Sequence, residues 1–310
     1  MTARDVSCTV EATQAGRTVA AVLKLAAGVS HSIARGLVDQ GLVRLNGMVA
    51  IDPARRVAEG DRIEARFDAG TRYAERPARR RETRLEGFRI ALEDEHLVVV
   101  DKQAGLITVP APAHPDDTLA DRLVAVYQSR GIKSPRLWVV HRIDRFTSGL
   151  VLFARSARAA LWLKDQFETR SAHREYLAIC EGIPTAAQRT LTSYLAENPR
   201  SLKVAETRDR ARGKRATLTY RIEERLNGAA LLRVTLETGR RNQIRVQLAG
   251  SGHPLVGDHT YGNPSGKIAR VALHAARLGF THPHTKAPVR VESPMPDDMT
   301  RLLRRLRASP

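Results

Sequence analysis

The chain has 310 residues, enough to bury one large hydrophobic core or two unequal ones. Its 51 lysines and arginines exceed its 33 acidic residues and give a net charge of +18, which predicts a polyanionic partner, most simply nucleic acid. Two cysteines are too few for a disulfide framework or a thiolate metal site, and no apolar run approaches the ~18 residues of a membrane span, so we expect a cytoplasmic protein.

The N-terminal part of the chain predicts a small basic domain that begins with two helices. Residues 1–11 are polar and unpatterned, and we expect a flexible N-terminal arm there. Apolar residues recur at helical spacing over residues 17–27, which Gly28 would end. They recur again over residues 31–40, which Ser30 would cap.

Three strands complete this domain, which we assign to residues 12–68. Residues 42–51 predict a β-hairpin around Asn46-Gly47, and a further strand covers residues 62–67. The order of elements, together with the segments Val-Arg-Leu-Asn-Gly and Glu-Gly-Asp-Arg-Ile, resembles the S4 RNA-binding domain. The side chains of this domain that we expect to contact RNA are Arg35, Arg44 and Arg55.

An arginine-rich segment separates this domain from the rest of the chain. Residues 69–86 carry six arginines, three glutamates and almost no apolar residues, which predicts an exposed linker. The remainder, residues 87–310, contains predicted strands, helices and several hairpins, one of them around Asn227-Gly228. Such a run of hairpins indicates a mixed, mainly antiparallel sheet, so we expect an α+β domain and not a doubly wound fold.

The sequence His-Arg-Ile-Asp-Arg-Phe-Thr-Ser-Gly at residues 141–149 is the most distinctive stretch of this second domain. It lies between two short apolar runs of strand length, so its polar side chains would be held in a rigid loop. Asp144 has Arg142 and Arg145 as neighbours, and guanidinium groups favour the ionised carboxylate that a nucleophile or general base requires. Taken alone, these residues also fit an ordinary turn. An aspartic protease motif is excluded because two residues separate Asp144 from Thr147 and no second copy exists.

This motif resembles the catalytic motif of the RluA-type pseudouridine synthases, and further family motifs occur in family order. The matching segments are Asp-Lys-Gln-Ala-Gly at residues 101–105, Arg-Glu-Tyr-Leu-Ala at residues 174–178 and Thr-Gly-Arg-Arg-Asn-Gln-Ile-Arg-Val-Gln-Leu at residues 238–248. Asn242 and Gln247 stand where the family has histidines. Both amides keep hydrogen-bonding capacity but do not titrate near neutral pH. We expect Asn242 to cap a helix that follows it.

The resemblance implies an RNA pseudouridine synthase, an isomerase that moves the glycosidic bond of a uridine from N1 to C5 of the base. It implies that Asp144 is the catalytic carboxylate, that Tyr176 lies against the target base and that Arg245 pairs with Asp144. Burial would raise the pKa of Asp144, whereas the nearby arginines would lower it. The implied RNA-binding side chains of this domain are Arg142, which would fill the space that the extruded base leaves, Arg145 and Arg240. No cofactor is implied.

The sequence leaves alternatives open for the RNA substrate and for the class of reaction. An S4-like domain ahead of the catalytic domain is typical of family members that act on large-subunit ribosomal RNA, with transfer RNA as the alternative substrate. An RNA N-glycosidase would use a similar carboxylate but release uracil, and a non-catalytic RNA-binding or ribosome-assembly protein would keep the fold. The histidines lack metal-ligand spacing, so we expect no metal site, and we expect a monomer.

Overall fold

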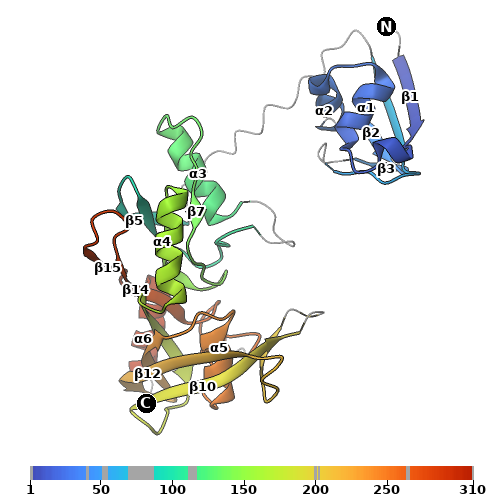
Figure 1. The fold of residues 1–310 in the computed structure, drawn as a ribbon. Coiled ribbons are helices and arrows are strands. Elements are labelled where there is room, and N and C mark those ends of the chain that lie inside the picture. Colours follow the sequence, from blue (N-terminus) through green and yellow to red (C-terminus); the bar gives the residue numbers. More distant parts are fainter. Residues whose placement is uncertain are drawn as a thin grey trace. The chain divides into compact units, whose positions relative to one another are not determined.

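The computed structural model describes the chain in segments that together form two compact units, residues 1–82 and 83–310 (Figure 1). The described segments are residues 3–39, 42–50, 55–68, 87–110, 117–198, 201, 203–262 and 266–308. The linker that the sequence predicts at residues 69–86 lies outside the described residues. Each unit is therefore treated by itself.

The N-terminal unit is a four-stranded antiparallel sheet packed against two helices. The strand order is β1-β4-β2-β3. Its elements are β1 (Ala3–Thr9), a short 3₁₀ helix (Ala12–Gln14), α1 (Val19–Ala27), α2 (His31–Asp39), β2 (Val43–Leu45), β3 (Met48–Val49) and β4 (Arg62–Asp68). The predicted helices, the hairpin and the returning strand are confirmed.

Local chemistry explains where the two helices begin and end. The Thr18 side chain accepts a hydrogen bond from the backbone N–H of Ala21, and Gly28 ends α1 in the left-handed conformation at φ 64°. Ser30 caps α2, since its hydroxyl oxygen accepts from the Ile33 N–H at 3.2 Å, as predicted. The turn between β2 and β3 places Asn46 and the glycine after it at positive φ, which Asn-Gly favours.

The prediction of a flexible arm at residues 1–11 is wrong for residues 3–9. These residues form β1, which pairs antiparallel with β4 from Ala3, opposite Asp68, to Thr9, opposite Arg62. The signal was present but short: the side chains of Val6 and Cys8 alternate with polar residues and pack against the core of the unit. A period of two over so few residues is easily read as an unpatterned polar segment.

The described residues contain neither a single helix long and apolar enough to cross a membrane nor a group of three His, Cys, Asp or Glu side chains that could hold a metal ion. Helix α1 and residues 31–38 meet the length and hydropathy criteria only as a pair, with a bend of 117° between them.

The C-terminal unit is built on a mixed sheet of eleven strands. The path of the sheet is β11-β10-β12-β13-β9-β14-β8-β6-β5, with β15 beside β14 and β7 beside β8. The strands are β5 (Phe88–Glu93), β6 (Leu97–Lys102), β7 (Trp138–Val139), β8 (Ser148–Ala154), β9 (His173–Glu181), β10 (Gln188–Glu197), β11 (Val204–Thr207), β12 (Lys214–Leu226), β13 (Ala229–Leu236), β14 (Leu273–Thr281) and β15 (Pro288–Glu292). Only β14 and β8 pair in parallel among the described strands, so the predicted α+β fold with a mainly antiparallel sheet is confirmed.

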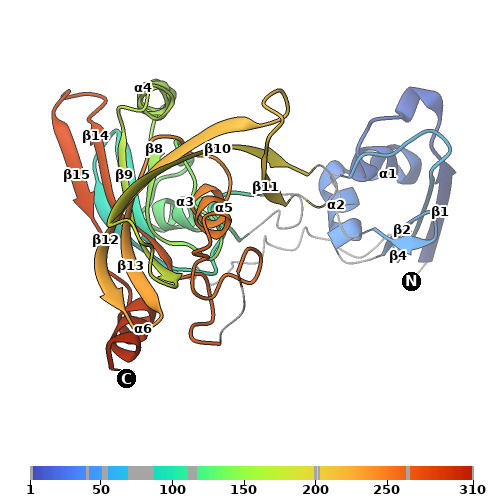
Figure 2. The ribbon, with the colours of Figure 1, turned by 90° about the horizontal axis from the view of Figure 1, so that it is seen from below.

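Helices cover both faces of this sheet (Figure 2). The helices are α3 (Leu119–Ser129), α4 (Ala157–Glu168), α5 (Gln243–Gly250) and α6 (Asp297–Ala308). Alternate residues of β8 show the division: Val151 and Phe153 pack with residues of α3 and α5, whereas Leu150 and Leu152 pack with residues of α4. Helix α6 packs on the sheet through a separate cluster that includes Ile179 of β9. Helix α3 is capped by Thr118 and not by Asp117, which has a φ of 61°.

The start of β8 is fixed by a glycine that no other residue could replace. Gly149 has a φ of 110°, and a Cβ at this position would collide with the backbone of Ala275. This close approach allows Ser148 and Gly149 to pair in parallel with His274 and Ala275 of β14. The loop of residues 141–147 therefore enters the sheet at a fixed point, which positions its side chains.

Candidate active site

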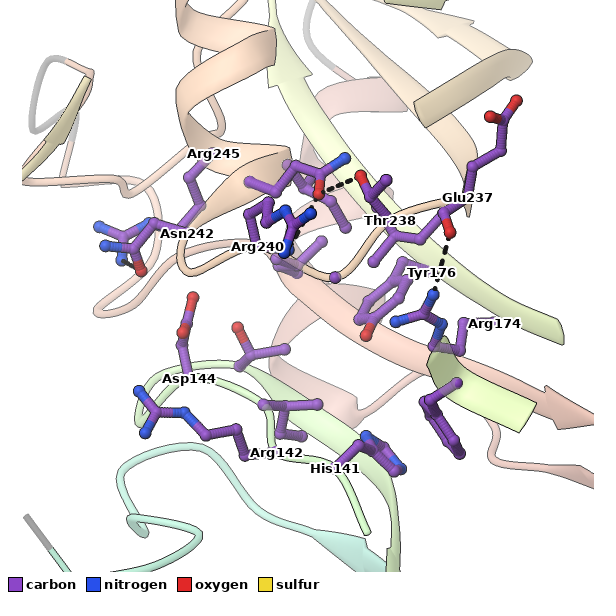
Figure 3. A pocket seen from close by; sticks show the side chains of 18 of the residues that line it. His141, Arg142, Asp144, Arg174, Tyr176, Glu237, Thr238, Arg240, Asn242 and Arg245 are labelled. Carbon is purple, nitrogen blue, oxygen red and sulfur yellow. Dashed lines mark hydrogen bonds between the residues drawn. The ribbon is translucent and has the colours of Figure 1, made fainter. Parts of the chain in front are cut away.

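A pocket of about 480 Å³ lies where three segments of the C-terminal unit meet (Figure 3). The segments are the loop of residues 140–147 before β8, the start of β9 near residues 174–176, and residues 236–245, which lead from β13 into α5. The end of α4 contributes a fourth side through Phe167. This volume is within the range of pockets that hold small ligands.

Two uncharged side chains, those of His141 and Thr108, help to hold the loop of residues 141–147. The Nε2 atom of His141 accepts from the Leu152 N–H at 3.1 Å, and the imidazole ring stacks on Phe167 with ring centroids 4.7 Å apart. Burial, with the nearby Arg174 charge, lowers the pKa of His141 to about 3, so the ring is neutral at physiological pH. The Thr108 hydroxyl donates to the Ile143 carbonyl at 2.8 Å. His141 is thus a structural acceptor in this loop.

A buried lysine supports the loop from behind. Lys102 is 1% exposed, and its Nζ donates to the carbonyl oxygens of Gln103, Leu106 and Arg145 at 2.8–3.2 Å. Burial lowers the pKa of Lys102 to about 7, although the charge of Asp144 opposes this. The segment of residues 101–105, which matches a family motif in the sequence, therefore ties β6 to the loop that carries Asp144.

The carboxylate of Asp144 is half-buried and lines the pocket. Burial raises its pKa by desolvation, while the positive charges of Arg245, Arg142, Arg241 and Lys102 oppose the rise. Within the described part of the chain, no side chain forms an ion pair or hydrogen bond with this carboxylate. Its oxygens therefore keep their full capacity for a substrate while several cations favour their ionised form.

Arg245 lies in the same pocket but is paired with a different carboxylate from the one expected. Its Nε and Nη2 atoms donate to Oδ2 and Oδ1 of Asp258, each at 2.8 Å, and Nη1 donates to Oδ1 of Asn242 at 3.1 Å. The expected pairing of Arg245 with Asp144 is thus not present; Arg245 acts on Asp144 through its charge over a longer distance. The fork of a guanidinium fits the bidentate geometry that the buried Asp258 carboxylate offers.

The two amides that replace family histidines have structural partners. Asn242 lies at the N-terminus of α5, but it adopts a φ of 53° and its side chain makes no capping hydrogen bond, so the predicted cap is wrong. The side chain instead donates to the Tyr261 hydroxyl and accepts from Arg245. Gln247 is buried, and its Nε2 donates to the Ser193 hydroxyl and to the carbonyl of Ala216. Neither residue supplies a titrating group to the pocket.

Two residues of β9 form the far wall of the pocket. Tyr176 is 7% exposed, and burial raises the pKa of its hydroxyl, which keeps it protonated. Arg174 is also 7% exposed; its guanidinium lies over the Phe167 ring, and Nη2 donates weakly to the Glu237 carbonyl at 3.5 Å. In the sequence, Arg174 stood out only as the first residue of the matching segment at residues 174–178. Its place in the pocket follows from strand alternation, because residues 174 and 176 share a face.

The remaining predicted residues fall into three locations. Arg142 and Arg240 are exposed at the pocket. Arg145 does not line the pocket; its Nε donates to the Gly105 carbonyl at 3.0 Å and its guanidinium lies over the ring of Phe146. The arginines expected to contact RNA in the N-terminal unit are exposed there, and they are Arg35, Arg44 and Arg55.

Comparison with solved structures first defines the class of protein. The human RNA pseudouridylate synthase domain containing 4 is 23% identical, with a TM-score of 0.59, over 70% of this chain and 92% of its own. The human RNA pseudouridylate synthase domain containing 1 is 23% identical, with a TM-score of 0.56, over 73% of this chain and 96% of its own. The fold of the C-terminal unit is therefore that of the pseudouridine synthases.

Sequence comparison then identifies the family. The family model described as RNA pseudouridylate synthase matches residues 96–250, and that of the S4 domain matches residues 19–63. The ribosomal large subunit pseudouridine synthase D of Xylella fastidiosa is 37% identical over 233 residues, 70% of this chain and 69% of its own. The protein of the same name from Haemophilus influenzae is 32% identical over 306 residues, 90% of this chain and 87% of its own. The chain belongs to the RNA pseudouridylate synthase family, and it is an isomerase that converts uridine to pseudouridine in RNA, as the motif resemblance implied.

Proposed function

We propose that this enzyme modifies large-subunit ribosomal RNA and that Asp144 is its catalytic carboxylate. The observation that carries the catalytic assignment is the environment of Asp144. It is a half-buried carboxylate without a direct partner among the described residues, and the charges that act on it most strongly are positive. The substrate assignment is supported by relatives named ribosomal large subunit pseudouridine synthase D and by the S4 domain at residues 19–63.

The proposed reaction begins with extrusion of a uridine from its stacked or paired position, which costs a few kcal/mol. Arg142, exposed on the loop beside Asp144, offsets part of this cost by stacking its planar cation in the vacated space. Asp144 then either adds to C1′ of the ribose or removes a sugar proton, while the C1′–N1 bond breaks. The base turns against Tyr176, C5 bonds to C1′, and the proton of C5 is replaced by one at N1, so that no atom is gained or lost overall.

Arg245 has an indirect role in this proposal. Because its guanidinium is fixed on Asp258, it supplies a positive charge of constant position to the Asp144 side of the pocket. Exposed arginines hold the RNA through its phosphates. They are Arg145 and Arg240 in the C-terminal unit and Arg35, Arg44 and Arg55 in the N-terminal unit.

The substrate is tested by incubating the purified enzyme with unmodified large-subunit ribosomal RNA and, separately, with unmodified transfer RNA. We expect pseudouridine at one or a few positions of the ribosomal RNA, and the same positions should lack it in cells without this gene. Modification of transfer RNA alone would contradict the substrate assignment. Release of free uracil with abasic RNA would identify an N-glycosidase, because isomerisation conserves the mass of the RNA.

A further inference from the structure

Arg174 is a buried cation for which the residues that the structure describes provide no counter-ion. It is 7% exposed in the wall of the pocket, and its Nε atom is buried without a hydrogen-bond partner among the described residues. The only hydrogen bond of the guanidinium recorded there is the 3.5 Å contact with the Glu237 carbonyl oxygen. A buried guanidinium normally has a paired carboxylate and satisfied N–H groups. Because Arg174 lines the pocket, its terminal Nη donors, which have no carboxylate partner among the described residues, are available to a ligand that enters it.

The carboxylates of the pocket do not fill this role. Glu168 and Glu237 line the pocket but are exposed, and neither lies within ion-pair distance of Arg174. The other near neighbours are the neutral ring of His141 and the protonated hydroxyl of Tyr176. Among the described residues, Arg174 thus has no counter-ion in the buried wall of the pocket.

Arg174 and Asp144 lie in different parts of the pocket, on either side of the Tyr176 hydroxyl. The cations that influence Asp144 come from elsewhere, chiefly Arg245 and Arg142, whereas the charge of Arg174 acts on Tyr176. Figure 3 shows the Tyr176 hydroxyl between the Asp144 carboxylate and the Arg174 guanidinium. In the proposed reaction, a uridine with its C1′ atom at Asp144 and its base against Tyr176 would direct a carbonyl edge of the uracil toward Arg174.

We propose that Arg174 donates hydrogen bonds to a carbonyl oxygen of the target uracil and stabilises the negative charge that the base acquires when the glycosidic bond breaks. This inference rests on the proposed function of the pocket. The C1′–N1 bond breaks with its electron pair on the base, where the charge spreads over N1 and the two carbonyl oxygens. The pair is used again when C5 bonds to C1′, and the C5 proton is then exchanged for one at N1. A fixed cation at a carbonyl oxygen favours the charged state over the neutral substrate, which is the requirement for catalysis.

The first test measures single-turnover rates at saturating enzyme. The substrate is a short, unmodified fragment of large-subunit ribosomal RNA that contains the target uridine. Arg174→Met should slow the chemical step about 100- to 1,000-fold, as loss of one such donor does in other enzymes, with the RNA dissociation constant within about twofold of wild type. Arg174→Lys, which keeps the charge, should recover most of this loss. The control is Arg158→Met, an exposed arginine of α4 outside the pocket, which should match wild type.

The second test identifies the atom that Arg174 contacts. The target uridine is replaced by 2-thiouridine or 4-thiouridine, whose sulfur is a weak acceptor, and each RNA is assayed with wild type, Arg174→Lys and Arg174→Met. Sulfur also changes the intrinsic reactivity of the base. The double-mutant cycle cancels this change, because it is the same for the wild-type enzyme and for the variant with which it is compared. We expect the effects of Arg174→Met and of the thio substitution on the single-turnover rate to be non-additive at either the 2- or the 4-position of the uracil.

The proposal is overturned if both thio substitutions are additive with Arg174→Met. It is also overturned if Arg174→Met weakens RNA binding while the rate at saturation is unchanged, since Arg174 would then hold a backbone phosphate. Failure of the proposed function is a separate result: the wild-type enzyme would leave the unsubstituted ribosomal RNA fragment unmodified in the same series.

Discussion

Asp144 and Arg245 lie in the same pocket but differ in whether their charged groups have a direct partner. Asp144 has no direct partner in the described part of the chain and is influenced by surrounding cations, whereas Arg245 is clamped on Asp258 by two hydrogen bonds of 2.8 Å. A carboxylate already paired with a guanidinium would be a weaker nucleophile or base. Fixing the arginine on a second carboxylate leaves its charge in place and Asp144 available.

Replacing Arg245 by lysine should lower the rate at saturating RNA about tenfold or more, which corresponds to about 1.4 kcal/mol of transition-state stabilisation. A lysine keeps the charge but cannot make the fork to Asp258, so the cation and the start of α5 lose their fixed position. The matched control is Arg233→Lys, an arginine clamped in the same way on Glu223 and outside the pocket, which should retain the wild-type rate. Equal rates for Arg245→Lys and wild type would show that the fork is dispensable.

The sequence predicts the chemical role of a single residue better than it predicts which residues that side chain contacts. Asp144, Tyr176 and Arg245 were assigned to one site from motif order, and all three line one pocket. The pairing of Arg245 with Asp258 was missed, because a contact between residues 13 positions apart around a turn has no local pattern. Arg174 was missed as a functional candidate because its significance depends on a lack of partners that only the packed structure reveals.

At the scale of elements, two segments of the chain hold the loop of residues 141–147 in place. The glycine at position 149 lets β8 pair with β14, and the last residue of β6, Lys102, supports the loop from the other side. The buried ammonium of Lys102 joins three carbonyl oxygens at the point where these elements meet. This support depends on pH, because burial lowers the pKa of Lys102 to about 7.

The stability of the C-terminal unit should therefore rise with pH between about 7 and 10.5. In this window the unfolded chain binds a proton at Lys102 that the folded chain has released, so unfolding becomes less favourable as pH rises, by at most about 5 kcal/mol. Below pH 7 both states are protonated and the cost of burying the charge is fully present. Denaturant unfolding at pH 7, 8.5 and 10 should show this slope in wild type and a smaller slope in Lys102→Met.

The control for this measurement is Lys164→Met, an exposed lysine of α4, which should keep the wild-type slope. An identical dependence on pH in wild type and Lys102→Met would contradict the assignment of a depressed pKa to Lys102.

Elements with strong local signals were predicted well. The Asn-Gly hairpin, the Ser30 cap and the Gly28 stop depend on conformations that a few neighbouring residues dictate. Strand β1 was missed because its stability comes from pairing with β4, more than fifty residues away in the chain. The conformation of Asn242 was missed because tertiary partners, Arg245 and Tyr261, take the side chain that would otherwise cap α5.

The whole molecule combines a basic N-terminal unit of the S4 type with a pseudouridine synthase unit, and its net charge is +18. Binding to RNA through phosphates releases counter-ions, so affinity should fall steeply as salt is added. This charge was evident from composition. The sequence predicts the boundary between the units from the arginine-rich segment at residues 69–86. That segment lies outside the described residues.

Replacing the three exposed arginines Arg35, Arg44 and Arg55 by alanine should weaken RNA binding without changing the rate at saturating enzyme. Each lost phosphate contact should also reduce the slope of log affinity against log salt by about 0.7 to 0.9. Binding titrations between 50 and 300 mM salt, with single-turnover rates alongside, measure both quantities. An unchanged affinity and slope would place the RNA-binding surface elsewhere.

The central claim concerns the carboxylate of Asp144, and the most direct measurement is the single-turnover conversion of unmodified large-subunit ribosomal RNA by Asp144→Asn. The amide is nearly the same size but cannot act as a nucleophile or base, so pseudouridine should be undetectable while the RNA dissociation constant stays within about threefold of wild type. Asp165→Asn, an exposed aspartate of α4, should react like wild type. Pseudouridine formed by Asp144→Asn at a rate near that of wild type would contradict the claim.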